Sequence, residues 1–448
     1  MRSRTITAAA AALALTALVL PSAQAHDVGK GHVLPPSLEV QQQEYANVTA
    51  EKSADHSNAP GSFAPCVKGM AAKTYPCKGV DMMSHVWPAE LGLSFINDIW
   101  GWVDPRTGAE YALVGGIEGT VFVAITDPKR PDVLGILPTH TSDYLFWRDI
   151  KVYANHAYIV SEDTGHGMQV FDLTRLRGVT GDPVTFTADF DYSGVSYSHN
   201  LNINEDTGFA YLVGTDTCDG GLHMVDLSDP SAPSFAGCWS DDGYIHDTQC
   251  VVYHGPDIEH AGREICVNSA ATFNDFSPEG ILNTVTVTDV TDKSAPLRLD
   301  SFEYPRDGYS HQGWLTPDQR YFVHNDELDE VFYGDPTTSR IFDLSDLDAI
   351  TLVASTDNGN TSIGHNQYIE GNRLYASNYT SGLRIFSTDH VADGDLAEIG
   401  YFDLYPENDN ASFEGGTWSN YPYYRSRSIA VSSMDRGLFI LRPRGNLG

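Results

Sequence analysis

Basic residues are scarce in this sequence. It holds 27 lysines and arginines against 60 aspartates and glutamates, which gives a formal net charge of −33 at pH 7. A protein of this charge repels nucleic acid and anionic membranes, so we expect neither as a partner. The excess of carboxylates suits divalent cations or cationic ligands, and it also serves solubility alone.

Several signatures of catalysis are missing as well. The sequence contains no G-x-S-x-G elbow, no P-loop and no H-E-x-x-H pair, which argues against the common serine hydrolases, phosphate-loop enzymes and zinc peptidases. No C-x-x-C spacing occurs, so a zinc knuckle or a dithiol redox site is not expected.

Long apolar runs are absent except at the N-terminus. The run Ala8–Leu20 follows a basic start and precedes the small residues Ala23–Ala25, which is typical of a secretory signal peptide over residues 1–25. No other stretch is long enough to span a membrane, so we expect a secreted, extracellular protein. Residues 26–65 are polar and lack hydrophobic periodicity, which predicts a flexible leader before a folded domain over 66–448.

The sequence has only six cysteines, an even number, which in a secreted chain indicates disulfide bonds. Fifteen pairings are possible for six cysteines. Pairing between neighbours in the sequence is the simplest arrangement, and it joins Cys66 with Cys77, Cys218 with Cys238, and Cys250 with Cys266.

A short polar cluster opens a strand-like run seven times, with a period of about fifty residues, and in four consecutive copies it begins with histidine. The clusters are Asn97–Trp100, Arg148–Lys151, His199–Asn202, His246–Gln249, His311–Trp314, His365–Tyr368 and Gly416–Ser419. A second element, a strand-like run that often ends in Asp, recurs in phase with the first, as in Gly119–Pro128 and Gly221–Pro230. Two further apolar runs complete most units.

Four short strands in each of seven units predict an all-β fold, a seven-bladed β-propeller. The last unit has only three strands before the chain ends, and Val80–Trp87 precedes the first inner strand. We therefore expect this N-terminal strand to complete the last blade and close the ring, which removes the exposed sheet edges.

These repeats resemble the LVIVD-type repeats of the secreted bacterial proteins called the choice-of-anchor B family. The resemblance covers residues 66–443 and is carried by Tyr75–Cys77 with Val80–Ser84, Ser198–Asn202, His246–Gln249, Ser310–Trp314, His324–Asp329 and Gly364–Gln367. It implies a secreted β-propeller, often with a C-terminal surface anchor. After Leu441 this chain shows no apolar tail, so we do not expect such an anchor here.

The polar clusters predict a shared site at one end of the propeller channel. Inner strands start on the same face, beside the acidic loops 161–167, 215–220, 325–330 and 377–381 that join the second and third strands. We therefore expect one group of seven candidate metal ligands: His199, His246, His311, His365, Asp98, Asp149 and Asp247. Imidazoles with carboxylates suit a transition metal, whereas carboxylates with amide oxygens suit calcium.

A structural role competes with this interpretation. Side chains alternate along a strand, so each histidine and its following residue should point to opposite faces, and one of the pair can bond backbone groups of the next blade. A histidine among acids also suits a general base. Two functions remain open. The first is a monomeric secreted binding or surface-interaction protein with a divalent cation at the channel mouth. The second is a secreted metal-dependent hydrolase that uses the histidine–acid ring.

Overall fold

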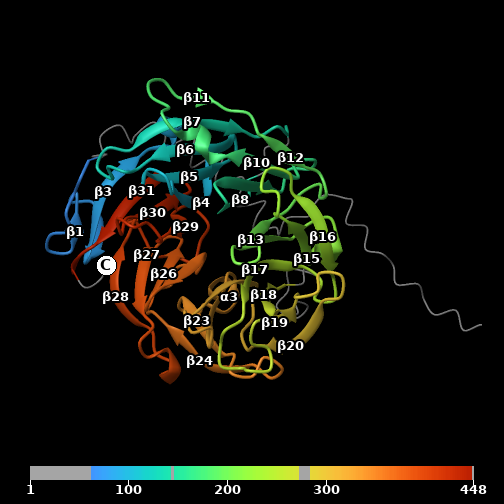
Figure 1. The fold of residues 1–448 in the computed structure, drawn as a ribbon. Coiled ribbons are helices and arrows are strands. Elements are labelled where there is room, and N and C mark those ends of the chain that lie inside the picture. Colours follow the sequence, from blue (N-terminus) through green and yellow to red (C-terminus); the bar gives the residue numbers. More distant parts are fainter. Residues whose placement is uncertain (1–61, 143–145, 272–282, 446–448) are drawn as a thin grey trace, which may run out of the picture. The chain divides into compact units, whose positions relative to one another are not determined.

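The computed structural model describes residues 62–142, 146–271 and 283–445. The predicted signal peptide and nearly all of the predicted leader lie outside these ranges, so both stay predictions. Within the described residues, seven sheets stand as blades around a ring, which confirms the predicted β-propeller (Figure 1). The helices of the described residues are too short to cross a membrane.

The first four blades follow one another along the chain, each starting at its inner strand. Blade 1 contains β4 (Ile96–Val103), β5 (Glu110–Gly116), β6 (Gly119–Ala124) and β7 (Asp132–Pro138), with β11 (Val184–Thr185) added in parallel to β7. Blade 2 contains β8 (Arg148–Tyr153), β9 (His156–Ser161), β10 (Met168–Asp172) and β12 (Phe190–Tyr192). Blade 3 contains β13 (Asn200–Asn204), β14 (Phe209–Val213), β15 (Leu222–Asp226) and β16 (Ser234–Trp239). Blade 4 contains β17 (Ile245–Val252), β18 (Glu264–Ala270), β19 (Thr284–Asp289) and β20 (Leu297–Glu303).

The last three blades include the strands from the start of the domain. Blade 5 contains β21 (Ser310–Leu315), β22 (Tyr321–Asp326), β23 (Thr338–Asp343) and β24 (Thr351–Asp357). Blade 6 contains β25 (Gln367–Glu370), β26 (Arg373–Asn378), β27 (Gly382–Ser387) and β28 (Ala397–Phe402), extended by β2 (Tyr75–Lys78) and β1 (Met70–Ala71). Blade 7 contains β29 (Thr417–Tyr421), β30 (Ile429–Ser433), β31 (Gly437–Pro443) and β3 (Val80–Val86). Short helical segments lie between strands: α2 (Pro88–Leu91), α3 (Asp329–Tyr333), η1 (Leu173–Leu176), η2 (Cys218–Gly220) and η3 (Val391–Asp393).

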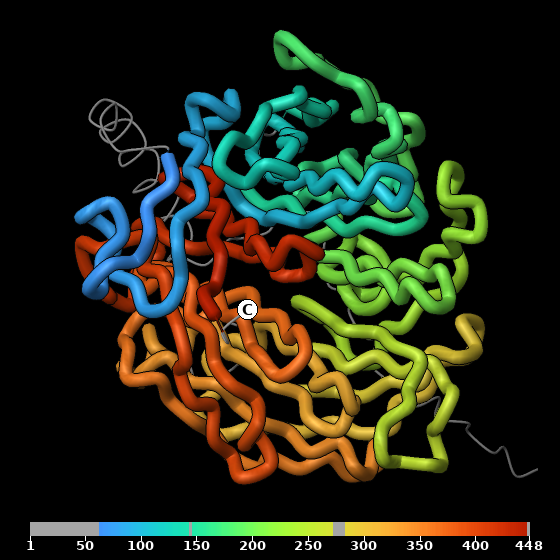
Figure 2. Tube along the Cα trace, turned by 60° about the vertical axis from the view of Figure 1, so that its left-hand side comes forward, coloured from blue at the N-terminus to red at the C-terminus, as the bar shows by residue number. Residues whose placement is uncertain are grey.

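The predicted ring closure is confirmed. Strand β3 pairs antiparallel with β31, and Met82 lies opposite Leu441. In Figure 2 the blue N-terminal segment runs beside the red C-terminal one. The hairpin of β1 and β2 extends blade 6 through the pairing of Cys77 with Phe402, an addition that the repeat pattern did not predict.

Third strands end in a turn that the sequence specifies. The carboxylate of the strand-terminal aspartate accepts a hydrogen bond from the backbone N–H two residues later in four of the blades, at Asp172, Asp226, Asp289 and Asp343. Aspartate favours such turns because its short side chain replaces a backbone acceptor.

The core lies between blades rather than in one centre. Strands β5, β18 and β22 are buried at every position, and their aliphatic and aromatic residues pack against the next blade, as Val267 does against Phe342. The inner strands lie side by side around the channel in the order β4, β8, β13, β17, β21, β25 and β29, and β29 returns to β4. This circuit brings residues that are far apart in sequence to one rim.

All three predicted disulfide bonds are present. They join Cys66 with Cys77, Cys218 with Cys238 and Cys250 with Cys266. The first attaches the chain before β1 to β2, and the third links two neighbouring strands of blade 4.

Candidate metal centre at the channel rim

Three of the inner strands that carry rim rings open with β-bulges. The pairing register shifts between Ile245 and Asp247 in β17, between Ser310 and Gln312 in β21, and between Thr417 and Ser419 in β29. The residues at these shifts are His246, His311 and Trp418. A bulge bends its strand and redirects the extra side chain, so these three rings are displaced from the ladder toward the rim.

The bulge also changes the relation between His246 and its neighbour. An uninterrupted strand sends His246 and Asp247 to opposite faces, as we expected from alternation. The bulge removes that constraint, and both side chains meet residues of other inner strands: His246 meets His199 and His311, and Asp247 faces Lys151. Strict alternation of these two side chains therefore stays a prediction.

Six rings form a continuous arc around the rim. Successive centroid distances are 4.4 Å from His199 to His246, 4.2 Å to His311, 4.3 Å to His365, 4.2 Å to Trp418 and 4.7 Å to Trp147. The structure thus brings together all four histidines of the predicted site. It adds two tryptophans from blades in which the repeat pattern shows no histidine.

Three of the four imidazoles have the same protonation pattern. Nδ1 of His246 donates to the carbonyl oxygen of His311 at 2.8 Å, and Nδ1 of His365 donates to that of Trp418 at 2.6 Å. A carbonyl oxygen only accepts hydrogen bonds, so Nδ1 carries the proton in both rings. Their Nε2 atoms therefore present a lone pair.

The same logic applies to His311. The side-chain amide of Asn325 donates to the carbonyl oxygen of His365, so its Oδ1 is the atom that faces Nδ1 of His311 at 3.3 Å. Nδ1 of His311 is then the donor. Its Nε2 is buried and has no hydrogen-bond partner among the described residues; the nearest carboxylate oxygen belongs to Glu327, at 3.8 Å.

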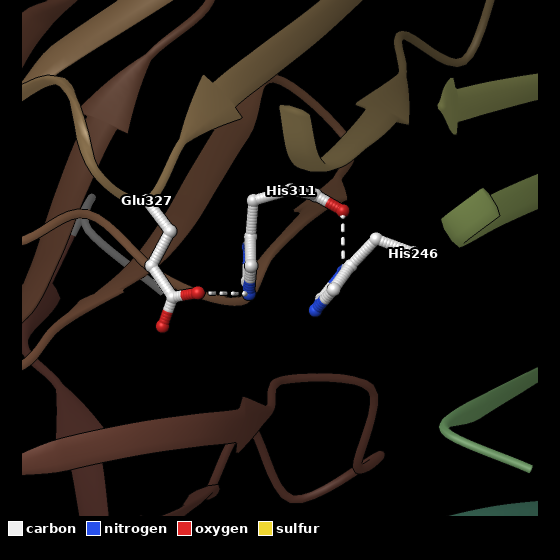
Figure 3. Close-up of side chains that lie close together, drawn as sticks. All are labelled: His246, His311 and Glu327. Carbon is white, nitrogen blue, oxygen red and sulfur yellow. Dashed lines mark hydrogen bonds and ion pairs between the residues drawn. The ribbon is translucent and has the colours of Figure 1, made fainter. Parts of the chain in front are cut away.

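Glu327 completes this group from the loop that follows β22. Its Oε2 faces His311 and its Oε1 lies 3.6 Å from Nε2 of His365 and accepts a hydrogen bond from Tyr379 at 2.7 Å. One ring nitrogen of His246, one of His311 and a Glu327 oxygen lie within 4.8 Å of one another, close enough to share an ion (Figure 3). Glu327 is absent from the predicted ligand set, although its loop was predicted to face the histidines.

Burial keeps the imidazoles of this group uncharged. It holds the pKa values of His246, His311 and His365 well below the ordinary range, with a further contribution from neighbouring imidazoles. Burial also raises the pKa of Glu327 to about 7. Neutral imidazoles are the form that accepts a metal ion, whereas Glu327 must release its proton to become a ligand, so binding at this group releases a proton.

His199 differs from the other three. Burial alone would lower its pKa, but Glu162, whose Oε1 lies 2.6 Å from Nδ1, outweighs burial and raises it. Nε2 of His199 lies 2.8 Å from Nε2 of His246, whose proton is on Nδ1, so His199 is the donor. The His199–Glu162 pair therefore borders the group as a hydrogen-bonded neighbour that donates to His246.

The three predicted aspartates lie in a second group around Lys151. Nζ of Lys151 lies 2.5 Å from Asp149 and 3.9 Å from Asp98. Burial raises the pKa of Asp98, and Asp149 raises it further; Asp149 has a lowered pKa because Lys151 outweighs the effect of burial. Burial raises the pKa of Asp247 to about 7.

Two of these aspartates also join adjacent blades. Asp98 accepts from the backbone N–H of Ile150, and Asp149 accepts from that of Leu201 at 2.7 Å. In the same way, the side-chain oxygen of Gln312 in blade 5 accepts from the backbone N–H of Gln367 in blade 6. The side-chain amide of Asn200 likewise donates to the carbonyl oxygen of His246 in the next blade. The structural role weighed for these clusters is therefore present at the second residue in four blades.

A third cluster lies away from the rim. Nε2 of His260 is 2.8 Å from Asp348 and 4.0 Å from Asp257. His260 and Asp257 belong to the loop between β17 and β18. None of these residues belongs to the recurring clusters, so the repeat pattern did not point to them.

Comparison with known proteins supports the repeat. The LVIVD repeat model matches residues 207–241, which include β14, β15 and β16. The third blade carries an LVIVD repeat. This finding confirms the resemblance to LVIVD-type propellers for that segment. No curated protein matches the sequence.

Solved structures share the architecture at low identity. "Kuenenia stuttgartiensis Hydrazine Synthase" is 11% identical, with a TM-score of 0.52, and the match covers 77% of this chain and 94% of that one. "Structure of U3-55K" is 12% identical, with a TM-score of 0.49 and coverage of 78% and 95%. At this identity the first likeness shows the propeller fold alone.

Proposed function

We propose that this protein is a secreted β-propeller of the choice-of-anchor B type that binds a divalent transition-metal ion at its channel rim and serves as a binding or surface-interaction protein. The ligands are Nε2 of His246, Nε2 of His311 and the carboxylate of Glu327, and binding of the ion replaces the hydrogen bond that His199 donates to Nε2 of His246. His365 and the His199–Glu162 pair border the site.

The observation that carries the proposal is the buried Nε2 of His311, which faces Glu327 without a hydrogen-bond partner among the described residues. Burying a polar atom without a partner is costly, so such an atom calls for an explanation such as an ion. A ligating histidine commonly donates its other ring N–H to a carbonyl or carboxylate. His246 and His311 do this through Nδ1.

The donor set favours a transition metal over calcium. Two imidazoles and one carboxylate suit zinc, copper, iron or nickel, whereas calcium takes six to eight oxygen ligands. The aspartates that would have supplied oxygen ligands bind Lys151 and blade backbones instead. Of the two metal classes kept open by the sequence, the transition metal is the better fit.

Burial favours a binding or structural role for the ion. His311 is 0% exposed and His246 is 4% exposed. Closed sites are typical of structural metals, whereas catalytic ones keep an open position for water or substrate. The observation in favour of the second function, a metal-dependent hydrolase, is the number of ligands, because two imidazoles and one carboxylate leave a fourth position of a tetrahedral ion for water.

Secretion belongs to the same proposal. Three disulfide bonds are compatible with an oxidising compartment. The N-terminal sequence supplies the export signal in this proposal.

Metal analysis tests the proposal directly. The protein is exported by a bacterial host and dialysed against zinc, then against metal-free buffer. Elemental mass spectrometry should then detect a single zinc ion per chain. His311→Ala and Glu327→Gln should each lose it, and the exposed control His390→Ala should keep it. Metal-free wild-type protein, or full occupancy in either of these two variants, contradicts the proposal.

The hydrolase alternative needs a separate readout. If the ion only binds or stabilises, zinc-loaded protein should hydrolyse p-nitrophenyl acetate and p-nitrophenyl phosphate no faster than the background rate. Turnover that disappears in Glu327→Gln but persists in His390→Ala would establish the hydrolase instead.

A further inference from the structure

A cavity of about 410 Å³ lies at the C-terminal ends of the inner strands. Its lining includes Lys151 and Val152 at the end of β8, Asn202 and Ile203 in β13, and Ile369 in β25. The histidines stand at the starts of these strands, three residues earlier, which corresponds to about 10 Å along the channel. The cavity is thus separate from the metal centre, and it falls within the size range of small-molecule sites.

Aromatic side chains from three blades form the walls, and we call the cavity the aromatic cup. Its lining rings are Trp100, Trp314, Tyr421 and Tyr423. Trp100 meets Tyr421 at 5.1 Å and 67°, and Tyr421 meets Tyr423 at 5.3 Å and 76°. The edge-to-face contacts hold the rings at large angles to one another, so ring surfaces stay available to a ligand.

Hydrogen-bond donors lie at the base of the cup. Lys151 is buried, with Nζ over the ring of Trp100 at 4.5 Å and paired with Asp149. Oδ1 of Asn202 accepts from the backbone N–H of Cys250, so its amide N–H₂ group is the end that remains for a ligand. Both side chains are more than nine-tenths buried, which makes them fixed parts of the cup.

A hydrogen-bond acceptor, Glu205, lies at the mouth of the aromatic cup. Glu205 lines the cup and is exposed, and it lies near enough to Tyr421 to contribute to the raised pKa of that phenol. A second, smaller cavity of about 180 Å³ continues from the cup past Asn202, Glu205 and Trp314. The cup therefore opens into a groove that has carboxylates along its edge.

We propose that the aromatic cup binds a neutral sugar. A sugar ring has an apolar face that packs on aromatic rings, and its hydroxyl groups both donate and accept hydrogen bonds. Lys151 and Asn202 meet its acceptors, and Glu205 meets its donors. The groove beyond the cup holds further residues of a saccharide chain.

Two other ligand classes fit less well. An organic cation is attracted by aromatic faces, but the ammonium of Lys151 already occupies the face of the Trp100 ring that it covers. An anion is attracted by Lys151, but Asp149 neutralises that charge and Glu205 repels the ligand at the rim. Only a neutral polyhydroxylated ligand uses all three polar groups.

Saturation-transfer NMR on the full exported protein tests this proposal. The probes are glucose, galactose, N-acetylglucosamine, maltose and cellobiose, with tetramethylammonium chloride as the competing class. At least one sugar should bind, and the dissociation constant should rise by about tenfold in Trp314→Ala and in Glu205→Gln. The exposed control Phe235→Ala should bind as wild type does.

The outcomes separate this proposal from the metal site. His311→Ala should lose the ion and keep the sugar, because the cup does not share a residue with the metal ligands. Binding of no sugar in the panel overturns the proposal, as does tighter binding of tetramethylammonium, or sugar binding that is unchanged in both cup variants. Glu205 is exposed, so Glu205→Gln keeps the test valid if Trp314→Ala fails to fold.

Discussion

The ring of His365 lies 4.2 Å from that of Trp418, and Nδ1 of His365 donates to the carbonyl oxygen of Trp418. His246 and His311 have the same relationship one pair of blades earlier. Trp418 thus takes in blade 7 the position that histidine takes in blades 3 to 6. The spacing of the repeats placed Gly416 at that position, two residues too early, and Trp418 lies at the register shift as His246 and His311 do.

Removing the hydrogen-bond partner of a metal ligand should weaken the metal centre without removing a ligand. Asn325→Ala deprives Nδ1 of His311 of its acceptor, so we expect metal affinity to fall by about 10–100-fold. Competition with a chromophoric chelator measures the change. Asn372→Ala, which alters an exposed asparagine, is the matched control. Unchanged affinity in Asn325→Ala would show that His311 is not held as a ligand.

Lys151 and Asp149 form a buried ion pair, so the effects of replacing the two residues on the free energy of unfolding should be coupled. Lys151→Met leaves the carboxylate of Asp149 buried without its cation, which should cost about 3–5 kcal/mol of the free energy of unfolding. Lys151→Met combined with Asp149→Asn should recover part of the loss, because the amide oxygen still accepts from Leu201. Urea denaturation of the variants measures both. An equal loss in single and double variants contradicts the pairing.

Ring closure should depend on the contacts of β31. Phe439 is 0% exposed and packs on Tyr75 and His85 from the N-terminal strands. We expect Phe439→Ala to lower the free energy of unfolding by about 3–5 kcal/mol. Phe235→Ala, at a ring that is 59% exposed, should change it by less than about 0.5 kcal/mol. Similar losses of unfolding free energy in the two variants would show that the contacts of Phe439 do not stabilise the closed ring.

Stability should depend on pH through His166 in blade 2. Burial, with help from the guanidinium of Arg148, lowers the pKa of His166 to about 3, and Nε2 of His166 lies 3.0 Å from Nη1 of Arg148. The unfolded chain binds a proton at this residue below its ordinary pKa of about 6.5, and the folded chain does not. Lowering the pH therefore favours unfolding, by about 2 kcal/mol at pH 5 from this residue alone.

Comparison with a variant isolates that contribution. Carboxyl groups with raised pKa values, such as Asp403 with a pKa of about 6, act in the opposite direction between these pH values, because the folded state binds their protons more tightly. His166→Gln removes only the histidine term. Its free energy of unfolding, followed by urea titration at several pH values, should fall less steeply toward acid than that of the wild type. Parallel curves refute the assignment.

Much of the fold was predictable from local patterns. Alternation within short runs, Asp-containing turns and the recurring polar clusters give the number of blades, the closing strand and the three disulfide pairings. These features depend on residues near one another in the sequence, or on a period that repeats along it. The extension of blade 6 by β1 and β2 has neither property, and the sequence did not point to it.

The candidate site was predictable in part. Position within the repeat brought His199, His246, His311 and His365 to one rim, and the loop assignment placed Glu162 and Glu327 opposite them. The sequence did not separate the aspartates from the histidines, since it does not show that Lys151 turns toward Asp98 and Asp149. Nor did it reveal that Trp147 and Trp418 continue the arc of rings.

By itself, the sequence determines the repeat, and the repeat determines the ring, because each unit must cover the apolar faces of its neighbours. The tertiary structure alone decides which polar atoms at the rim meet. A β-bulge changes the direction of a side chain, and a backbone carbonyl from the next blade decides which nitrogen of an imidazole carries the proton. Both effects depend on backbone positions in two blades at once, and such positions leave no pattern in either stretch of sequence.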